Sequence, residues 1–459
     1  MSVFSLSNLK KTWYYLQKNG IRNAVWAVLE RIGQEQEVYT WQEPDEKTLS
    51  FQREHSASLR ISIVVPAYRT KKEHLEAMLN SVSRQSYPHW ELIVADAGGT
   101  AESVQAWAKK NGICLREAAD ASNLAEWKDR SIVLCTLSEN KGISANTNAG
   151  IELAAGDAVG LLDHDDLLTA NALWEMADCL EKEKKRGKQK LVLFSDEDKC
   201  DGAASRFYEP NFKPDFDGEL LLTNNYICHF TVIETAFLKE LKLRSGFDGA
   251  QDYDLVLRAY AAGGQFVHVP KVLYHWRCHE ASTASNPQSK RYAYEAGQRA
   301  LEDYCLRKGW KATVSGLKHL GFYREDYEDS VFCQRPEIGI WAKPLPGGRD
   351  VFGIRHPKGF LVSGLYENDG SMRYAGLRKG YSGPMHRAAL QQSAPAADLR
   401  SMEVCSALKE RYAQTIAELK EACQGLPTAA QETKILQKSM EFCKEATAAG
   451  YGILWDPQA

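Results

Sequence analysis

Val159-Gly-Leu-Leu-Asp163-His-Asp165-Asp166 joins an apolar segment directly to three carboxylates. The apolar part is typical of a buried strand, which would carry the acids to one edge of a sheet. Alternation along an extended chain places Asp163 and Asp165 on the same side. Two carboxylates in this arrangement tolerate each other best with a divalent cation between them and a diphosphate beyond it. The alternative is an N-cap of a helix that begins at Leu167.

The chain has 459 residues, 44% of them hydrophobic, and a formal charge of -3. This length exceeds one comfortable core, so we expect two domains or one large domain with additions. The charge argues against a nucleic-acid-binding surface, which would be basic. Eleven scattered cysteines without a CxxC pair favour reduced, intracellular usage. Without a signal sequence or an apolar run of roughly 18 residues, we expect a cytoplasmic protein.

Residues 1–58 are predicted to form a helical extension followed by a linker. Apolar residues recur at helical spacing between Leu9 and Ile32, among basic and aromatic side chains. Such helices either pack on the next domain or lie on the anionic inner face of a membrane as a peripheral contact. The polar segment 43–60 contains Pro44 and is the expected linker.

From residue 59 onward, short β-branched runs alternate with segments of helical spacing. The expected strands are residues 61–66, 90–96, 131–137 and 191–194. This alternation predicts an α/β domain, residues 59–325, with a mostly parallel, Rossmann-like sheet. Ligands bind beyond the carboxyl ends of such strands. Pro66, Tyr68 and Asp96 are therefore expected around one site.

More polar groups follow the later strands. Ser195–Lys199 forms a second acidic cluster, which we expect after a strand that ends at Phe194. The proline-broken segment 208–215 is expected to be a loop. A glycine-containing loop then leads to a helix whose first turn carries Asp252 and Asp254. Acids suit this end of a helix, so a capping role explains either one, but Asp252 at the loop exit is better placed to accept a proton.

The segment His275-Trp-Arg-Cys-His-Glu-Ala-Ser282 gathers imidazole, guanidinium and hydroxyl groups, which suit a diphosphate and its metal ion. Together with the earlier motifs, this order resembles glycosyltransferase family 2, and in particular the bacterial members that build cell-surface polysaccharides, O-antigens and rhamnose-containing glycans. The resemblance runs from about residue 60 to 285. It rests on Ser62-Ile-Val-Val-Pro66 with Tyr68, Val94-Ala-Asp96, Asn140-Lys-Gly142, Leu162–Asp166, Ser195–Lys199, Asn211–Asp215, Gln251–Leu255 and Tyr274–Arg277.

The resemblance implies a GT-A fold and an inverting hexosyltransferase that uses Mg or Mn and a UDP-, dTDP- or GDP-sugar. It implies that Asp252 is the catalytic base. The implied donor-binding residues are Pro66, Tyr68, Asp96, Asn140, Gly142, Asp163, Arg277 and Ser282. The implied metal site, with the DxD signature, consists of Asp163, Asp165, Asp166 and His279. Acceptor or supporting roles are expected for Asp196, Asp198, Asp254, His275 and Trp276. Ala97-Gly98-Gly99 departs from the family's frequent Asp-Gly-Ser.

The last third, residues 326–459, is predicted to be an α/β or α+β module. A shift of 187 positions aligns residues 252–270 with 439–457 without a gap and pairs Ala261-Ala-Gly263 with Ala448-Ala-Gly450. This alignment indicates either a chance match of alanine-rich helices or a truncated second transferase-like domain. Ser439 then stands in the place of the acid, so the module is expected to be non-catalytic.

The sequence therefore predicts a glycosyltransferase that extends a surface polysaccharide on a lipid-linked glycan acceptor. A nucleotidyltransferase is a rival, but it would need a glycine-rich loop after the first strand, and residues 65–70 contain no glycine. An inactive carbohydrate-binding or scaffold pseudo-transferase is the second rival. The presence of Asp163, Asp165 and Asp252 together argues against it.

Overall fold

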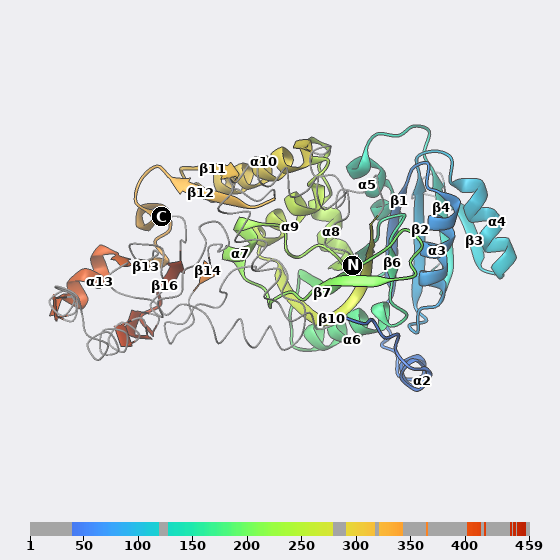
Figure 1. Ribbon diagram of the computed structural model, residues 1–459, viewed down its shortest axis with the longest axis horizontal. Helices are drawn as coiled ribbons and strands as arrows, with labels where there is room; N and C mark the ends of the chain where they lie inside the picture. The colour runs from blue at the N-terminus through green and yellow to red at the C-terminus, as the bar shows by residue number, and fades with distance from the viewer. Residues whose placement is uncertain are drawn as a thin grey trace, which may run out of the picture. The chain divides into compact units, whose positions relative to one another are not determined.

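The computed structural model describes residues 39–118, 127–278, 291–316, 321–342, 364–365, 402–414, 417–418, 441–442, 444–446 and 448–455. The chain divides into two compact units (Figure 1). The large-sheet unit comprises residues 39–218 and 225–308, and the small-sheet unit comprises 1–38, 219–224 and 309–459. Within the described part of the chain, no helix is both long and apolar enough to cross a membrane.

The large-sheet unit is built on a sheet with the strand order β3-β4-β2-β1-β5-β9-β7-β10-β6, and β8 lies beside β7. Its strands are β1 (Ile61–Ala67), β2 (Trp90–Asp96), β3 (Cys114–Ala118), β4 (Ser131–Thr136), β5 (Ala158–Leu161), β6 (Leu167–Leu168), β7 (Leu191–Cys200), β8 (Phe207–Asn211), β9 (Thr231–Glu234) and β10 (Gln265–Arg277). All pairs from β3 to β5 are parallel, as is β7 with β10. Strands β6, β8 and β9 pair antiparallel. The predicted α/β class with a mostly parallel sheet is confirmed.

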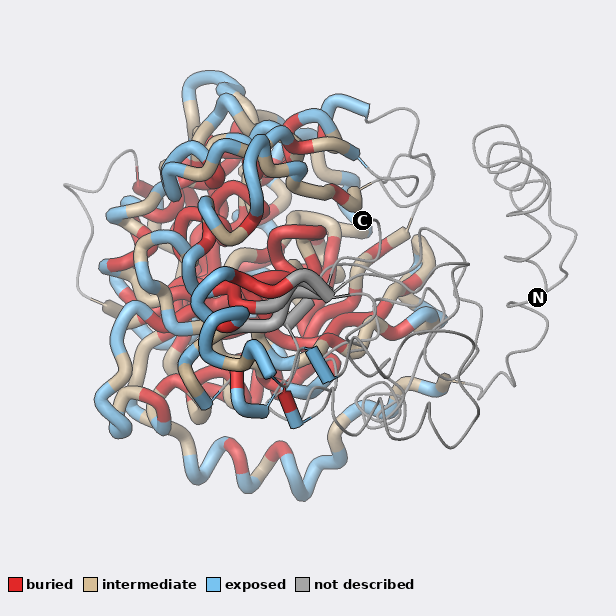
Figure 2. The backbone as a smooth tube through the Cα atoms, turned by 90° about the vertical axis from the view of Figure 1, so that its left-hand side faces the viewer, coloured by how far each residue is buried: buried red, intermediate tan, exposed pale blue. Residues whose placement is uncertain are grey.

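Helices cover both faces of this sheet. They are α3 (Lys72–Ser83), α4 (Ala101–Asn111), α5 (Ile143–Leu153), α6 (Ala172–Lys185), α8 (Thr235–Leu241) and α9 (Gln251–Ala261); α10 (Arg291–Lys308) follows. In β1, Ile63 and Val65 pack in the core under α3, α4 and α6, whereas Val64 packs in the core under α5, α8 and α9. Burial on both faces explains why this strand is a continuous apolar run. Figure 2 shows buried residues in the interior and exposed ones around them.

Two segments that we expected to be irregular contain regular structure. Helix α2 (Glu46–Glu54) lies within the expected linker 43–60. Asp45 caps this helix by accepting from the amide of Thr48 at 2.7 Å, and buried Gln52 accepts from the hydroxyl of Ser86 at 2.8 Å. Strand β8 lies within the expected loop 208–215. Its Pro210 is tolerated because β8 is bonded to the sheet only through β7, as an edge strand is.

The second acidic cluster is also placed differently from the expectation. Strand β7 does not end at Phe194 but continues to Cys200, so Ser195–Lys199 belongs to the sheet. Strand β10 pairs with it over this whole length, as far as Arg277 opposite Cys200. The backbone pairing of two long strands therefore outweighs the polar character of the segment.

The described part of the small-sheet unit includes a second sheet, with the order β14-β16-β13-β15, and a hairpin. The strands of the sheet are β13 (Ile338–Ala342), β14 (Gly364–Leu365), β15 (Met402–Val404) and β16 (Gly452–Trp455); the hairpin is β11 (Ala312–Gly316) and β12 (Tyr323–Tyr327). Short helices α11 (Val331–Gln334) and α13 (Ser406–Arg411) accompany them. Arg335 forms a buried, bidentate ion pair with Glu219, at 2.6 and 2.7 Å.

The second sheet repeats the strand arrangement around β7 and β10. Strands β13 and β16 are parallel, as β7 and β10 are, and β15 is antiparallel to β13, as β9 is to β7. Helix α13 follows β15 almost at once, as α8 follows β9. Strand β10 begins at Gln265, opposite Leu191; 187 residues later β16 begins at Gly452, opposite Ile338.

The helices before these two strands end in the same way. Gly263 and Gly450, again 187 residues apart, both have left-handed backbones with φ of 78° and 90°. The amide that follows each glycine donates to the carbonyl of a buried alanine, Ala259 at 2.8 Å or Ala446 at 3.1 Å. This is a helix C-terminus that requires glycine. The two segments therefore share main-chain hydrogen bonds as well as an alanine-rich sequence.

Candidate active site

The acidic loop, residues 162–166, connects β5 to β6. Asp163 and Asp165 are half-exposed, whereas Asp166 is buried. Asp166 accepts from the hydroxyl of Tyr274 at 2.6 Å and from the amide of Arg277 at 2.7 Å. Burial and the two neighbouring carboxylates raise the pKa of Asp166 well above its ordinary value. Asp166 therefore fastens the loop to β10.

The helix-cap interpretation of this loop is wrong. Helix α6 begins only at Ala172, and its N-cap position is occupied by Asn171. Strand β6 separates the acids from that helix and pairs with β10. The acids therefore lie at the carboxyl end of β5, as the strand interpretation predicts.

Asp163 faces groups from two other segments. Burial in the site raises its pKa; the cationic ring of His229 opposes this shift, and the carboxylates of Asp165 and Asp252 add to it. Its side chain is still 44% exposed, so water screens these interactions. The Nε2 atom of His229 lies 3.9 Å from the carboxylate of Asp163. The structure thus brings Asp163, His229 and Asp252 into one site.

His229, just before β9, lies between two acids. Its Nδ1 atom is 3.4 Å from the carboxylate of Glu197, and its amide also donates to Glu197. Burial lowers the pKa of His229, but Glu197 and Asp163 outweigh burial and raise the pKa to about 9. The ring stacks on Tyr274, with centroids 4.8 Å apart, and lies 5.9 Å from Trp276. The two acids therefore stabilise the protonated form of the His229 ring.

Glu197 is balanced by a buried lysine. The Nζ atom of Lys213 lies 3.5 Å from the Glu197 carboxylate and also donates to the carbonyl of Ile227 at 2.9 Å. Lys213 is only 1% exposed. Burial would raise the pKa of Glu197, but Lys213 and His229 lower it to about 2. Glu197 is thus an anion at neutral pH and holds His229 in place.

Asp252 is in the first turn of α9, where the helix dipole favours a carboxylate. It is half-exposed and accepts from the amide side chain of Asn225 at 2.9 Å. Asp254 is buried instead and accepts from the Nε atoms of Arg244 at 3.1 Å and Arg258 at 3.0 Å. Of these two acids, only Asp252 belongs to the site.

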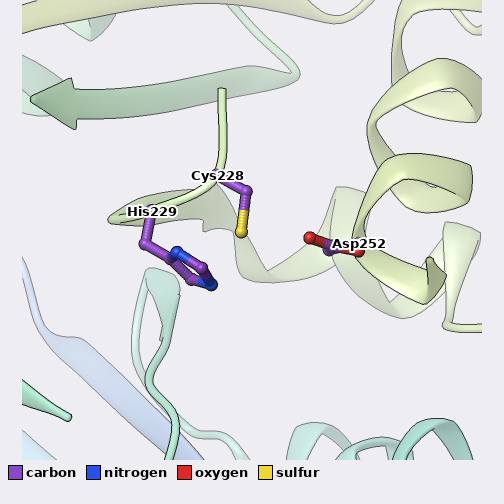
Figure 3. A group of neighbouring side chains, drawn as sticks. All are labelled: Cys228, His229 and Asp252. Atoms are coloured by element: carbon purple, nitrogen blue, oxygen red, sulfur yellow. The ribbon is translucent and has the colours of Figure 1, made fainter. Parts of the chain in front are cut away.

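Cys228 lies beside Asp252 and His229. One donor atom from each residue lies within 4.8 Å of the other two, and all three side chains are half-buried. Figure 3 shows the sulfur between the imidazole ring and the carboxylate, with Asp252 on the helix and the other two residues on the segment before β9. Burial, Asp252 and Glu197 raise the pKa of the thiol well above its ordinary value.

The expected donor-binding residues at the ends of β1 and β2 lie close together. Pro66 pairs with Ala95, and Tyr68 is 40% exposed, with the ring of its side chain beside Gly98. Asp96 is buried and accepts from the amides of Gly98 at 3.0 Å and Ala101 at 2.8 Å. Asp96 therefore shapes the loop between β2 and α4, while Tyr68 presents an accessible aromatic face.

Asn140 and Gly142 form the tight entrance to α5. The side-chain oxygen of Asn140 accepts from the amide of Gly142 at 3.1 Å and from the side chain of Asn146 at 2.9 Å. Gly142 has φ of 93°, and a Cβ atom there would collide with the carboxylate of Asp248. Asp248 in turn accepts from the amide of Ser144 at 3.3 Å. Only glycine fits this position without strain.

The other two acids of β7, Asp196 and Asp198, accept hydrogen bonds from neighbouring residues. Asp196 accepts from the amide of Lys213 at 2.8 Å and lies 2.9 Å from the Nε2 atom of His268. Asp198 accepts from the hydroxyl of Tyr39 at 2.7 Å and pairs with the ring of His275. These contacts do not involve the group around Asp163.

The end of β10 supports the acidic loop. Arg277 is 2% exposed; its guanidinium donates to the main-chain carbonyls of Asp165 and, at 2.6 Å, Gly202. The expected site residues His279 and Ser282 lie outside the described residues.

Sequence reasoning assigned no role to Glu197, Lys213, Cys228 or His229, although these residues link the site together. Glu197 lies within the motif Ser195–Lys199, and Lys213 lies within the motif Asn211–Asp215. Cys228 and His229 lie just before β9. A histidine and a cysteine before a strand, in a segment rich in asparagine, were the available signal. Glu197 lies 16 residues from Lys213 and 32 residues from His229 in the chain, so the pairing itself could not be inferred.

Comparison with known proteins gives an independent result. Residues 62–241 match the model of a family described as glycosyl transferase family 2. The chain is 36% identical over 255 residues to the uncharacterized protein y4gI of Sinorhizobium fredii. These residues are 55% of this chain and 26% of that protein. It is 34% identical over 256 residues to the O-antigen biosynthesis protein RfbC of Myxococcus xanthus, which covers 56% of this chain and 19% of that protein.

A third relative has a more specific name. It is the UDP-Glc:alpha-D-GlcNAc-diphosphoundecaprenol beta-1,3-glucosyltransferase WfgD of Escherichia coli, 29% identical over 114 residues, which are 25% of this chain and 38% of that protein. The chain spans only about a quarter or less of y4gI and RfbC. The region that matches the family model, residues 62–241, contains the acidic loop and extends to the end of α8.

Proposed function

We propose that this chain transfers a sugar from a nucleotide-sugar donor to a glycan acceptor during synthesis of a cell-surface polysaccharide. The match of residues 62–241 to the model of glycosyl transferase family 2 supports this proposal. The observation that carries this proposal is the meeting of Asp163, His229 and Asp252, which come from three separate segments. An acid that can accept a proton thus lies beside an acidic loop that suits a cation and a diphosphate.

In this proposal Asp252 is the general base. The side chain of Asn225 donates to its carboxylate and orients it at the start of α9. Asp252 removes the proton from an acceptor hydroxyl while the oxygen attacks the anomeric carbon of the donor. The bond between that carbon and the nucleoside diphosphate breaks on the opposite side, so the configuration inverts. A positioned base of this kind contributes about 10²–10⁴-fold to the rate.

Asp163 and Asp165 would hold the Mg or Mn ion. Burial and the nearby carboxylates already disfavour the ionised form of Asp163, which is the condition that a bound cation relieves. The oxygen-only donor set also fits these hard ions. When bound, the ion stabilises the negative charge that develops on the departing diphosphate. The buried carboxylate of Asp166 would hold the loop in position, because Tyr274 and Arg277 occupy it.

The acceptor in this proposal is a lipid-linked glycan at the inner face of the cytoplasmic membrane. The name of WfgD, which contains a UDP-sugar and a diphosphoundecaprenol-linked sugar, supports this choice. The name of RfbC supports an envelope polysaccharide as the product. The accessible ring of Tyr68, beside the loop that Asp96 shapes, would bind the base of a UDP-, dTDP- or GDP-sugar by stacking.

We further propose the domain limits 1–58, 59–325 and 326–459, the last being a truncated and non-catalytic relative of the transferase domain. The repeated pairing of β13, β15 and β16 supports this interpretation. Ser439, in the place of Asp252, has no carboxylate to act as a base. This module would bind the acceptor or mediate association. A chain ending near residue 325 with unchanged acceptor affinity, activity and oligomeric state would contradict that role.

The test of the main proposal is a panel of UDP-, dTDP- and GDP-sugars, with and without Mn, in which thermal stabilisation and sugar transfer are both measured. One donor should stabilise the protein only with the metal, and Asp165→Ala should abolish this effect. Asp252→Asn should abolish transfer while donor affinity stays near that of the wild type. A well-folded protein that responds to no donor, or a loss of donor affinity in Asp252→Asn, would overturn the proposal.

A further inference from the structure

The cluster of Cys228, His229 and Asp252 offers sulfur, nitrogen and oxygen donors within 4.8 Å of one another (Figure 3). We propose that it is a binding site for Zn²⁺, distinct from the Asp163–Asp165 pair to which the donor's metal ion is assigned. Because the three side chains are half-buried, an ion could enter without unfolding of the segment.

The chemistry of the three ligands favours zinc. Zinc binds cysteine sulfur at about 2.3 Å, histidine nitrogen at about 2.0 Å and carboxylate oxygen at about 2.0–2.2 Å, in a tetrahedron. Donor atoms in such a tetrahedron are about 3.3–3.7 Å apart, so these side chains need to move together by about 1 Å at most. Three protein ligands leave the fourth position open to water or another small ligand.

The type of ligand atom would determine which metal ion binds at this cluster and which binds at the Asp163–Asp165 pair. Mg²⁺ and Mn²⁺ prefer oxygen ligands, whereas thiolate and imidazole favour zinc. Asp163 and Asp165 offer only carboxylates. The side chain of Asn225 already orients Asp252 at 2.9 Å, and the Glu197 carboxylate lies beside the imidazole of His229. A carboxylate next to the ring is the usual environment of a histidine that binds a metal. Zinc binds a thiolate and a neutral imidazole, so Cys228 and His229 each release a proton to solvent when the ion binds.

Binding has a consequence for catalysis, and this part rests on the proposed function. A zinc ion on the carboxylate of Asp252 would occupy the lone pairs that must accept the acceptor's proton. Zinc should therefore inhibit transfer even when Mg²⁺ saturates the donor site. The binding itself does not depend on Asp252 being the base.

The binding test uses Co²⁺ as a spectroscopic substitute for zinc in the full chain, after removal of metal. Binding should produce the near-ultraviolet charge-transfer band of a cobalt–thiolate bond, and Zn²⁺ should abolish it by displacement. Cys228→Ser should lose the band. Cys278→Ser is the matched control, because Cys278 is another half-buried thiol of the large-sheet unit, and it should keep the band.

Asp252→Asn gives a second, independent variant and should weaken Co²⁺ binding at least tenfold. Asp165→Ala should keep the band, since Asp165 belongs to the other site. Absence of the band in the wild type, or its persistence in a folded Cys228→Ser protein, would overturn the proposal.

The inhibition test measures transfer at saturating Mg²⁺ over a series of Zn²⁺ concentrations, relative to each variant's own rate without zinc. Cys228→Ser should raise the half-inhibitory concentration at least tenfold, whereas Cys278→Ser should leave it unchanged. Equal sensitivity of the two variants would refute inhibition through this site. If no donor supports transfer, the proposed function fails, but the cobalt band still decides whether the metal site exists.

Discussion

Replacement of Lys213 by methionine should destabilise the protein far more than an ordinary lysine substitution. Lys213 is 1% exposed and compensates the charge of Glu197, which is also buried. The fall in the pKa of Glu197 from 4.5 to about 2 corresponds to about 3 kcal/mol in favour of the ionised, folded form. Loss of one partner of a buried ion pair costs about 3–5 kcal/mol in general. We expect a loss of this size for Lys213→Met at pH 7.

The effect should also depend on pH. A carboxyl group whose pKa is lowered by folding contributes its stabilisation above its unfolded pKa, here 4.5, and loses it as the pH falls toward 2. The wild type therefore loses part of the benefit of Glu197 in mild acid. The difference in unfolding free energy between wild type and Lys213→Met should be about 1 kcal/mol smaller at pH 4 than at pH 7.

The assay is urea unfolding followed by circular dichroism at both pH values. Lys199→Met is the matched control: Lys199 also pairs with a glutamate, Glu209, at 2.7 Å, but this pair is exposed to solvent. Its loss should cost about 1 kcal/mol or less. Equal effects of the two substitutions, or a Lys213→Met effect that does not change between pH 7 and pH 4, would refute the account of Glu197 as a buried anion.

Three further substitutions test other parts of the site. Gly142→Ala should lower thermal stability and donor affinity together, because a Cβ at φ of 93° collides with Asp248; unchanged donor affinity would separate this loop from donor binding. Asp254→Asn should cost about 3 kcal/mol in urea unfolding through loss of its buried arginine pairs; a neutral result would contradict a structural role. In the metal-free protein, Asp166→Asn should raise the melting temperature at pH 7, because burial raises the pKa of Asp166 and disfavours its charged form. The increase should be smaller at pH 5, where more of the wild-type carboxyl group is protonated. A loss of stability at pH 7 would show that the ionised form is favoured.

The sequence was sufficient to locate the central parallel strands. Strand β1 and strand β2 are buried on both faces, so their apolar runs are unmistakable. The sequence was insufficient for β7, where a strand continues through four charged residues. Its acids are compatible with a sheet only because Asp196 pairs with His268, and Asp198 with His275, more than 70 residues further along the chain. Local pattern contains no information about partners at that distance.

The candidate site, like the fold, could be predicted from the sequence only in part. Asp252 could be preferred over Asp254 from its position at the exit of a flexible loop, and the structure places only Asp252 beside Asp163. The group formed by Glu197, Lys213 and His229 could not be predicted, because burial and pairing together set their charges. An isolated histidine or glutamate in sequence does not reveal whether it will be ionised.

The two sheets together suggest how the chain acquired its second unit. The arrangement that recurs in the small-sheet unit is that of β7, β9 and β10, which in the large-sheet unit lies beside the proposed base. The parallel strands from β3 to β5, which lead to Asp96 and to the acidic loop, have no counterpart among the described strands of the second sheet. On the proposal that this unit is a truncated copy, its described strands would retain a framework for the acceptor side without the strands that lead to the carboxylate pair. On the proposal that residues 326–459 are a truncated transferase-like domain, Ser439 in the place of Asp252 is expected, because an acid in that position would have no donor to act on.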